Sequence, residues 1–257
     1  MSVSKVLKMI KDKEVKFVDL RFTDTKGKWQ HTAQTSTTID ENTFKEGIMF
    51  DGSSIAGWKN INESDMILMP DSSTAVMDPF TAQPQLILFC DVIEPTDGKP
   101  YELDPRSTGK KAENYLKTSG IGEKCFFGPE AEFFIFDDVK WATNQEYTFF
   151  SIDSEEGAYN TGSEMEGGNM GHRPKDKGGY FPVPPVDSAT DIRAEMVSTM
   201  TEMGIEMEKH HHEVAPSQHE LGFKFGSLIE SADNLQKYKY CVHMVAQAYG
   251  KTATFMP

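Results

Sequence analysis

Apolar residues in the first hundred positions recur with two different periods. A period near 3.6 predicts a helix from Ser4 to Asp12, and a period of two predicts strands over residues 16–22 and 29–35, with a glycine turn between them. The nearly continuous apolar stretch within residues 84–94 predicts a strand that is buried on both faces. Weaker patterns predict a helix over residues 40–46 and strands over residues 66–70 and 73–77. This part of the chain therefore resembles a small β-rich unit with two short helices.

Helical periodicity is more extensive after residue 100. Asp104 followed by Pro105 is typical of a helix start, Gly120 is typical of a helix end, and Ser188 with Asp191 resembles a capping box. The apolar stripe that follows predicts the buried face of a second helix: Ile192, Met196, Met200 and Met203. The remaining patterns predict a Gly/Pro-rich loop over residues 159–187, a helix over residues 231–249 with Leu235, Tyr238, Val242, Val245 and Tyr249 facing inward, and a strand starting within residues 251–257.

Two acidic residues enter a hydrophobic strand in the middle of the chain. Residues 133–136 are aromatic and β-branched, which predicts a buried strand, and strand alternation places Glu130 and Glu132 on one face, about 7 Å apart. Two carboxylates in this arrangement repel each other and resist burial, so one interpretation is a cation between them. The other interpretation is a solvated strand end with no ligand.

A second acidic cluster favours the first interpretation. Residues 206–220, predicted as a strand and a turn, contain four glutamates and four histidines. Carboxylates with imidazoles suit Mg²⁺ or Mn²⁺, and zinc is less expected because the segment lacks closed Cys/His ligand spacing. Glu213 and Glu220 are the strongest ligand candidates, whereas most of the histidines are expected to lie on a solvated strand.

Composition excludes several classes of protein. The chain has 257 residues, of which 38% are hydrophobic and 11% aromatic, so it is globular and long enough for one large or two smaller domains. The formal charge of −14 argues against nucleic acid or an anionic membrane as a partner, and the sequence shows neither an apolar run of membrane length nor a signal-peptide pattern. Cys90, Cys125 and Cys241 are widely spaced, so we expect reduced thiols that pack as small apolar side chains in a cytoplasmic protein.

Four motifs together point to a family. They are FDGSS at residues 50–54, GPEAEFF at residues 128–134, HHEVA at residues 211–215 followed by QHE at residues 218–220, and GKTATFMP at residues 250–257. In order and spacing they resemble the bacterial type I glutamine synthetases, and the resemblance covers the chain. A single motif would be modest support, whereas four in sequence are specific.

The resemblance implies an α+β fold. A small β-grasp-like N-terminal domain over residues 1–103 is followed by part of a curved antiparallel-sheet catalytic domain with flanking helices over residues 104–257. The implied activity is the ATP-dependent ligation of ammonia to L-glutamate through a γ-glutamyl phosphate intermediate. The implied cofactors are two or more Mg²⁺ or Mn²⁺ ions per site, with ATP as co-substrate, and the implied partners are glutamate, ammonium and further copies of the chain in a ring-shaped homo-oligomer.

The resemblance also assigns metal ligands. Glu132, Glu213 and Glu220 match the positions that bind one ion, and Glu130 matches a ligand of a second ion. Convergent carboxylates agree with what phosphoryl transfer requires, since cations must bridge the transferred phosphate and neutralise its charge.

Substrate-contacting residues are likewise implied by the resemblance. Glu208 and the backbone around Phe223 and Phe225 match nucleotide contacts. Asp51 matches the acid that binds ammonium and takes a proton from it, and its loop is expected to serve the site of a neighbouring subunit. A positioned carboxylate is chemically necessary, because ammonium itself is not a nucleophile.

The sequence also departs from the family pattern. Family members continue with an Asn-Gly loop, a metal-binding histidine, a metal-binding glutamate, several arginines and an acidic flap, and none of these occurs in the 257 residues. We therefore expect an amino-terminal part that has little or no activity by itself. Two other functions remain open: a γ-glutamyl–amine (polyamine) ligase of the same superfamily, and a non-catalytic metal-binding fragment.

Overall fold

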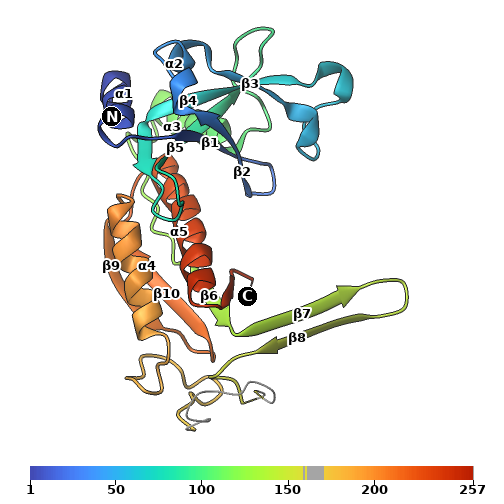
Figure 1. Ribbon diagram of the computed structural model, residues 1–257, viewed down its shortest axis with the longest axis vertical. Coiled ribbons are helices and arrows are strands. Elements are labelled where there is room, and N and C mark those ends of the chain that lie inside the picture. The colour runs from blue at the N-terminus through green and yellow to red at the C-terminus, as the bar shows by residue number, and fades with distance from the viewer. Residues whose placement is uncertain (159, 161–170, 257) are drawn as a thin grey trace. The chain divides into compact units, whose positions relative to one another are not determined.

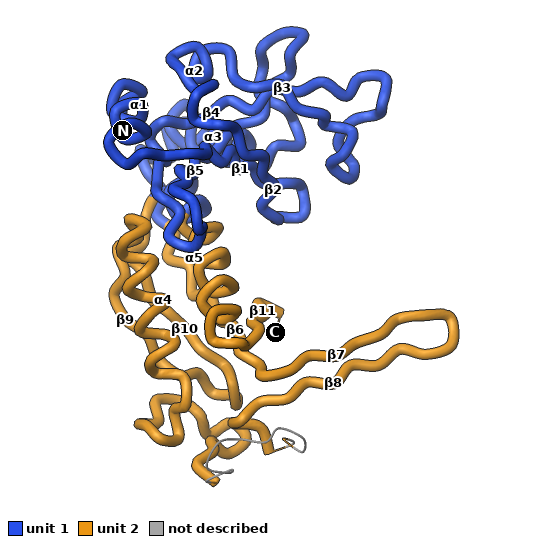
Figure 2. Tube along the Cα trace, viewed as in Figure 1, with its two compact units in different colours: residues 1–126, 227–233 blue, residues 127–226, 234–257 orange. Residues whose placement is uncertain are grey.

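The computed structural model describes residues 1–158, 160 and 171–256. These residues form two compact units, one of residues 1–126 with 227–233 and one of residues 127–226 with 234–257 (Figure 2). The combination of helices with mainly antiparallel strands confirms the predicted α+β class. The domain boundary expected between residues 103 and 104 stays a prediction, because a compact unit and a family domain need not divide a chain at the same residue.

The first unit is built on a five-stranded sheet (Figure 1). Its strand order is β2-β1-β5-β4-β3, in which β1 and β5 are parallel and the other neighbours antiparallel. The strands are β1 (Phe17–Thr23), β2 (Trp29–Thr35), β3 (Ile48–Asp51), β4 (Asp65–Met77) and β5 (Gln85–Ile93). The helices are α1 (Val3–Asp12), α2 (Thr43–Glu46) and α3 (Pro105–Thr118), with 3₁₀ turns at Ser36–Thr38, Gly52–Ser54 and Ile61–Glu63.

The core of this unit follows the predicted periodicity. Val18, Leu20 and Phe22 of β1 are buried and share a core with Val6 and Ile10 of α1. Full burial of an aliphatic or aromatic side chain stabilises a fold by about 1.5–3 kcal/mol. The alternating pattern therefore determines which face of β1 receives α1.

Two local predictions for this unit are wrong. The cap of α1 is Ser2 and not Ser4, since the Ser2 hydroxyl accepts the N–H of Lys5 at 3.4 Å. The two short strands predicted between residues 66 and 77 are one continuous strand, β4. Its pairing with β5 shifts register between Asp71 and Val76, and this irregularity accommodates the polar residues that interrupt the apolar pattern.

A charged cluster joins α3, the sheet and the first turn of α5 (Leu228–Ala248). The Arg106 guanidinium donates to Asp71 at 2.8 Å, Asp91 at 2.7 Å and Asp233 at 3.0 and 3.1 Å, and only 8% of its side chain is exposed. Burial alone would raise the pKa of Asp71, but hydrogen bonds from a neighbouring serine and from Arg106 lower it to about 2. The first turn of α5 therefore belongs to the first unit, and the rest of the helix to the second.

The second unit holds a four-stranded antiparallel sheet in the order β11-β6-β10-β9 and a separate hairpin, β7–β8. The strands are β6 (Glu132–Phe136), β7 (Asp138–Thr143), β8 (Thr148–Asp153), β9 (Met207–His212), β10 (Gln218–Phe223) and β11 (Thr252–Thr254). Its helices are α4 (Thr190–Glu202) and the larger part of α5.

Helices α4 and α5 pack together against the four-stranded sheet. Tyr238 of α5 is fully buried, and its hydroxyl donates to the carbonyl oxygen of Ala131 at 2.7 Å and accepts the N–H of Leu221 at 3.1 Å. The Cys241 thiol of α5 lies 3.6 Å from the Met196 carbonyl oxygen of α4. The methionine stripe of α4 lies in this core, as predicted.

Three predictions for the helices of this unit are wrong, and one for the loop before α4 is confirmed. The capping box at Ser188 is wrong, because α4 is preceded by Ala189 and the Ser188 hydroxyl bonds Glu156 instead. Tyr249, predicted to face inward, is 43% exposed, and α5 begins at Leu228 rather than at residue 231. Residues 171–187 contain no helix or strand, in agreement with the predicted loop, and residues 159 and 161–170 of that loop lie outside the described residues.

The hairpin β7–β8 was not anticipated from the sequence. It extends away from the four-stranded sheet of its own unit (Figure 1). Pairing of Trp141 with Phe150 and of Val139 with Ile152 places four apolar side chains on one face of the hairpin. Trp141 is 73% exposed and Phe150 78% exposed. An apolar face of this size on a two-stranded hairpin is characteristic of an interaction surface.

Burial of the cysteines agrees with prediction at two positions of three. Cys90 and Cys241 are buried, whereas Cys125 is exposed, so the prediction of apolar packing is wrong for Cys125. Burial raises the pKa of the Cys241 thiol to about 12, which keeps that thiol protonated and unreactive. Among the described residues, no helix combines the length and the apolar composition needed to cross a membrane.

We expect Arg106→Ala to lower the free energy of unfolding by about 1–3 kcal/mol, because three partly buried carboxylates lose their shared donor and only Lys110 remains to pair with Asp71 and Asp91. Urea unfolding measures this change. Since the folded pKa of Asp71 lies below its ordinary 3.8, the stabilisation is complete above that pH and is lost as the pH falls toward 2. Lys8→Ala, which removes an exposed pair with Asp12, is the control and should leave stability unchanged. Equal effects of both variants at neutral pH would contradict this account.

Candidate metal centre

Three strands of the second unit bring acidic and imidazole side chains into one row. In the antiparallel register, Glu220 of β10 lies opposite Glu132 of β6 and opposite His211 of β9. Directly opposed residues share a face of a sheet, so the three side chains project from the same side. The alternating residues Phe133 and Leu221 fall on the other face, where they are buried against α5. The row therefore lies on the face that the helices leave open.

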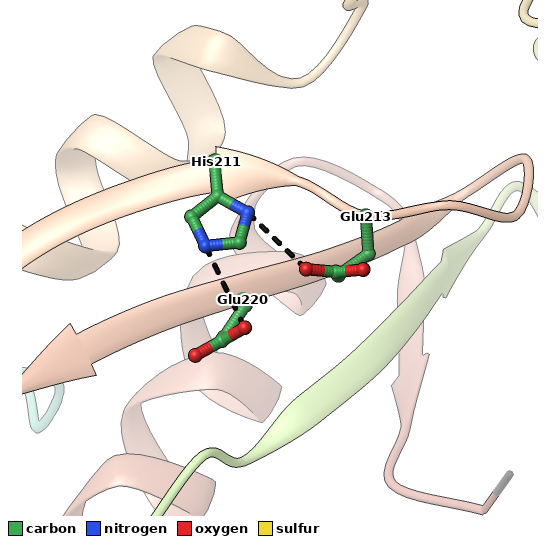
Figure 3. A group of neighbouring side chains, drawn as sticks. All are labelled: His211, Glu213 and Glu220. Carbon is green, nitrogen blue, oxygen red and sulfur yellow. Dashed lines mark ion pairs between the residues drawn. The ribbon is translucent and has the colours of Figure 1, made fainter. Parts of the chain in front are cut away.

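Glu213 joins this row from the turn that follows β9. Figure 3 shows the His211 ring between two carboxylates, with Nδ1 at 3.4 Å from Glu213 and Nε2 at 3.5 Å from Glu220. One ligand atom from each of the three residues lies within 4.8 Å of the others. Both carboxylates are largely buried, at 8% and 7% exposure. Burial of two acids beside one imidazole is typical of a cation site.

The chemistry of the three side chains fits a hard divalent cation. Two ligand atoms on one Mg²⁺ lie at most about 4.2 Å apart, so small side-chain rotations would close the cluster on an ion. Burial raises the pKa of Glu220, the charges of Glu213 and Glu130 add to this, and His211 and Lys209 oppose it. The ionised form of Glu220 is therefore disfavoured without a ligand, and a cation would stabilise it.

The other two predicted metal ligands lie at the edge of this cluster. Glu132 is exposed and accepts a hydrogen bond from the Gln218 amide. Glu130 is exposed and precedes β6, so the predicted strand face begins only at Glu132. Its charge nevertheless acts on Glu220.

The loop before α4 covers one side of the cluster. The rings of Tyr180 and Phe181 meet the His211 imidazole nearly edge-on, at centroid distances of 5.7 and 4.8 Å. This close approach depends on Gly179, where a Cβ atom would lie 2.7 Å from the Glu213 carbonyl oxygen. A larger residue at this position would displace the loop or the turn that carries Glu213.

The prediction that most histidines lie on a solvated strand is wrong for the helix-covered face. His212 and His219 are each 1% exposed. Arg193 of α4, also 1% exposed, pairs with both carboxylate oxygens of Asp187 and lies 3.0 Å from Nδ1 of His219. Burial and the Arg193 charge lower the pKa of His219 to about 3, so that ring is neutral at physiological pH. Polar partners on α4 make burial of these imidazoles possible.

His212 forms a buried ion pair with Glu156, at 2.7 Å between Nε2 and Oε2. Burial alone would raise the pKa of Glu156 and lower that of His212. Their hydrogen bond and mutual attraction reverse both effects, so the pKa of Glu156 falls to about 2 and that of His212 is raised. No pattern in the sequence pointed to Glu156.

Asp51, the predicted proton acceptor, lies in the first unit at the end of β3 and is exposed. Its carboxylate accepts the hydroxyl of Ser53 at 2.6 Å and the N–H of Ser53 at 2.9 Å, and these bonds lower its pKa. Gly52 is required beside it, because a Cβ atom there would lie 2.3 Å from the Met66 sulfur. The glycine thus lets the Asp51 loop pack closely on β4.

The predicted nucleotide contacts lie at the end of β9 and β10 that is remote from the cluster. Glu208 is exposed and occupies a bulge, since Gly222 pairs with Lys209 and Phe223 with Met207. Phe223 is a core residue at 5% exposure, whereas Phe225 is 57% exposed. The Phe223 side chain is therefore unavailable to a ligand, and the nucleotide contact expected of the backbone in this segment stays a prediction.

Comparison with models of protein families identifies the family of this chain. The model of the glutamine synthetase β-grasp domain matches residues 14–95, and that of the glutamine synthetase catalytic domain matches residues 102–257. The chain belongs to the glutamine synthetase family. Family membership confirms the resemblance inferred from the four motifs, including the β-grasp character of the N-terminal part.

Individual glutamine synthetases are similar over the whole chain. That of Azospirillum brasilense is 62% identical over 255 residues, which are 99% of this chain and 54% of the relative. That of Rhizobium meliloti (strain 1021) is 60% identical over 256 residues, which are 100% of this chain and 55% of the relative. The chain spans about half the length of the curated relatives it matches.

A solved glutamine synthetase shares the fold. The cryo-EM structure of the Plasmodium falciparum glutamine synthetase superimposes with a TM-score of 0.91 at 29% identity, covering 100% of this chain and 50% of that one. The similarity confirms the predicted fold of a β-grasp-like part followed by a curved, mainly antiparallel sheet with helices.

Sequence reasoning overlooked His211 as a member of the cluster. The sequence does contain a signal for this role of His211. It precedes Glu213 by two residues, so strand alternation puts both side chains on one face. Its pairing with Glu220 across the turn would have supported the same conclusion.

We expect Glu220→Gln to raise the melting temperature of the chain in EDTA at neutral pH. An acid whose folded pKa is raised destabilises the fold above that pKa, and the amide removes the charge. With millimolar MnCl₂ the order should reverse, since the wild type gains stability by binding the ion and the variant gains less. Thermal unfolding under both conditions tests this reversal.

Glu206→Gln is the matched control, because Glu206 is exposed and pairs with Lys224 at the surface. It should respond to Mn²⁺ as the wild type does. If Glu220→Gln were destabilised in EDTA, or stabilised by Mn²⁺ as much as the wild type, the cluster would not be a strained cation site.

Proposed function

We propose that this chain carries the metal- and nucleotide-binding part of a glutamate–ammonia ligase. The γ-phosphoryl group of ATP is transferred to the side-chain carboxylate of L-glutamate, and ammonia then replaces the phosphate to give L-glutamine. We assign this chemistry to a catalytic domain of residues 104–257 and to the cytoplasm. Family membership supports the reaction, and the cluster of His211, Glu213 and Glu220 is the observation that carries it.

The cluster supports phosphoryl transfer through its charge. In our assignment Glu132, Glu213 and Glu220 hold one ion and Glu130 contributes to a second. A bound Mg²⁺ or Mn²⁺ would neutralise the charge on the transferred phosphate. The carboxylates would hold the ions at fixed positions, and burial of Glu213 and Glu220 beside the loop with Tyr180 would limit access of water to them.

The ammonia step is assigned to Asp51. Its lowered pKa keeps the carboxylate ionised, so it can bind an ammonium cation. Transfer of one ammonium proton to Asp51 leaves ammonia with a free electron pair, which attacks the carbonyl carbon of γ-glutamyl phosphate. The C–O bond to phosphate then breaks, phosphate leaves with the bonding electrons, and the added nitrogen gives a second proton to the departing phosphate to form the amide.

Nucleotide binding is assigned to the far end of the same two strands. The exposed Glu208 at the bulge and the backbone around Phe223 and Phe225 are the proposed contacts. Residues three to four positions apart on a strand are separated by about 10–13 Å, which suits an ATP molecule whose phosphates reach the metal cluster.

Association with further copies of the chain is part of the proposal, with each site completed by the Asp51 loop of a neighbour. The exposed apolar face of the β7–β8 hairpin supports it, because Trp141 and Phe150 would be buried in an assembly.

We expect the 257-residue chain to bind Mn²⁺ in calorimetry, and Glu132→Ala and Glu213→Ala to weaken binding by at least about tenfold through loss of a ligand. Glu146→Ala, which removes an exposed acid from the hairpin loop, should bind as the wild type does. A wild-type chain without Mn²⁺ affinity, or a Glu132→Ala variant with unchanged affinity, would refute the metal assignment.

The reaction itself requires a separate test. The polypeptide encoded by the whole gene should be assayed for glutamine formation from ATP, glutamate and ammonium. Faster turnover of methylamine than of ammonium would favour an amine ligase and refute the proposed substrate.

We expect the double variant Trp141→Ser/Phe150→Ser to shift the chain to smaller assemblies, since it removes the apolar face of the hairpin. Light scattering after size-exclusion chromatography measures the mass. Lys140→Ser, on the opposite face of β7, is the control and should keep the wild-type mass. An unchanged mass in the double variant would exclude the hairpin as an association surface.

A further inference from the structure

The turn between β9 and β10 carries Glu213 of the proposed metal site. It ends at Ser217, whose φ of 65° lies in the left-handed region. A non-glycine residue keeps this conformation only where its surroundings hold it there. The position of the Glu213 carboxylate therefore depends on the groups that fix the two ends of this turn.

A single buried carboxylate, that of Glu156, meets both ends of the turn. Its Oε2 accepts the N–H of Ser217 at 2.6 Å and lies 2.7 Å from Nε2 of His212, the residue that precedes the turn. Its Oε1 accepts the hydroxyl of Ser188 at 2.8 Å. Only 3% of the Glu156 side chain is exposed. Glu156 itself follows β8, so it is anchored in a segment remote in sequence from the turn.

His212 connects Glu156 to the backbone of Glu213. Its Nδ1 lies 2.6 Å from the Glu213 carbonyl oxygen, while its Nε2 faces the Glu156 carboxylate. Since both ring nitrogens face acceptors, both carry hydrogen and the ring donates at each end. Strand alternation places His212 beneath the sheet and His211 above it, so this chain of bonds supports the cluster from the opposite face.

We propose that Glu156 is a positioning residue for the metal site: acting through His212 and Ser217, it sets the turn so that Glu213 faces His211 and Glu220. The inference rests on the proposed function, because it takes the cluster to be a metal site. Partners that orient a metal ligand from behind change metal affinity by about 10–100-fold when removed. A residue needed only for folding would change stability and leave the affinity of the folded chain unchanged.

The test is Mn²⁺ affinity of the chain, measured from the EPR signal of free Mn²⁺ well below the melting temperature of each variant. Glu156→Gln removes the negative charge while keeping the shape, and should weaken Mn²⁺ binding about 10–100-fold. His212→Asn should do the same. The double variant should bind no more weakly than the weaker single variant, because both residues act through one chain of bonds.

Asp104→Asn is the matched control. Asp104 is a fully buried carboxylate of the first unit that also accepts backbone N–H groups and a serine hydroxyl. Because Asp104 belongs to the first unit, Asp104→Asn should leave Mn²⁺ affinity unchanged. Glu156→Asp keeps the charge but shortens the side chain by one methylene, so it should give a smaller loss of Mn²⁺ affinity. This variant replaces Glu156→Gln if Glu156→Gln does not fold.

The outcomes separate this inference from the proposed function. Wild-type binding, together with weakened binding in the folded Glu156 variants and unchanged binding in Asp104→Asn, supports the inference. The inference is overturned, while the metal site stands, if the folded Glu156 and His212 variants bind Mn²⁺ as tightly as the wild type. An equal loss of Mn²⁺ affinity in Asp104→Asn would also overturn the inference. A wild-type chain that binds no Mn²⁺ overturns the metal site, and this inference with it.

Discussion

The acidic row depends on the register of β10, and that register is determined by apolar side chains on the other face of the strand. A shift of one residue would turn Leu221 toward the open face and Glu220 into the core beneath α5. Burial of side chains such as Leu221 and Phe133 contributes about 1.5–3 kcal/mol each, and burial of an unpaired carboxylate opposes folding. The hydrophobic face of the sheet therefore holds the candidate ligands in position.

The two faces of this sheet satisfy buried charge in different ways. Beneath it, each carboxylate has a cation from the chain itself, as in the pairs of Asp187 with Arg193 and of Glu156 with His212. Above it, Glu213 and Glu220 share a single imidazole, so negative charge exceeds positive charge. Complete internal pairing is characteristic of a structural network, whereas an excess of acid is characteristic of a site that binds a cation. The same strands thus carry structural ion pairs on one face and the candidate metal ligands on the other.

Sequence reasoning succeeded where a local pattern decides the outcome. Period-two alternation located β1, and the stripe through Met196 and Met200 located the core face of α4. The proximity of Glu213 to Glu220 follows from a short turn between two strands. By contrast, the partner of His212 lies 56 residues earlier in the chain, and no local periodicity reports so distant a contact. The hairpin was missed because its apolar side chains are exposed, so the usual link between hydrophobicity and burial fails there.

The discontinuity of the first unit has a consequence for synthesis on the ribosome. Asp233, which completes the carboxylate cluster around Arg106, emerges only after residues 127–226 have been translated. Until then the nascent β-rich part lacks both this carboxylate and the first turn of α5. Its final tertiary contacts thus form only after β6, β9 and β10 of the four-stranded sheet have been synthesised, so the first unit cannot complete its folding before synthesis of the second unit has begun.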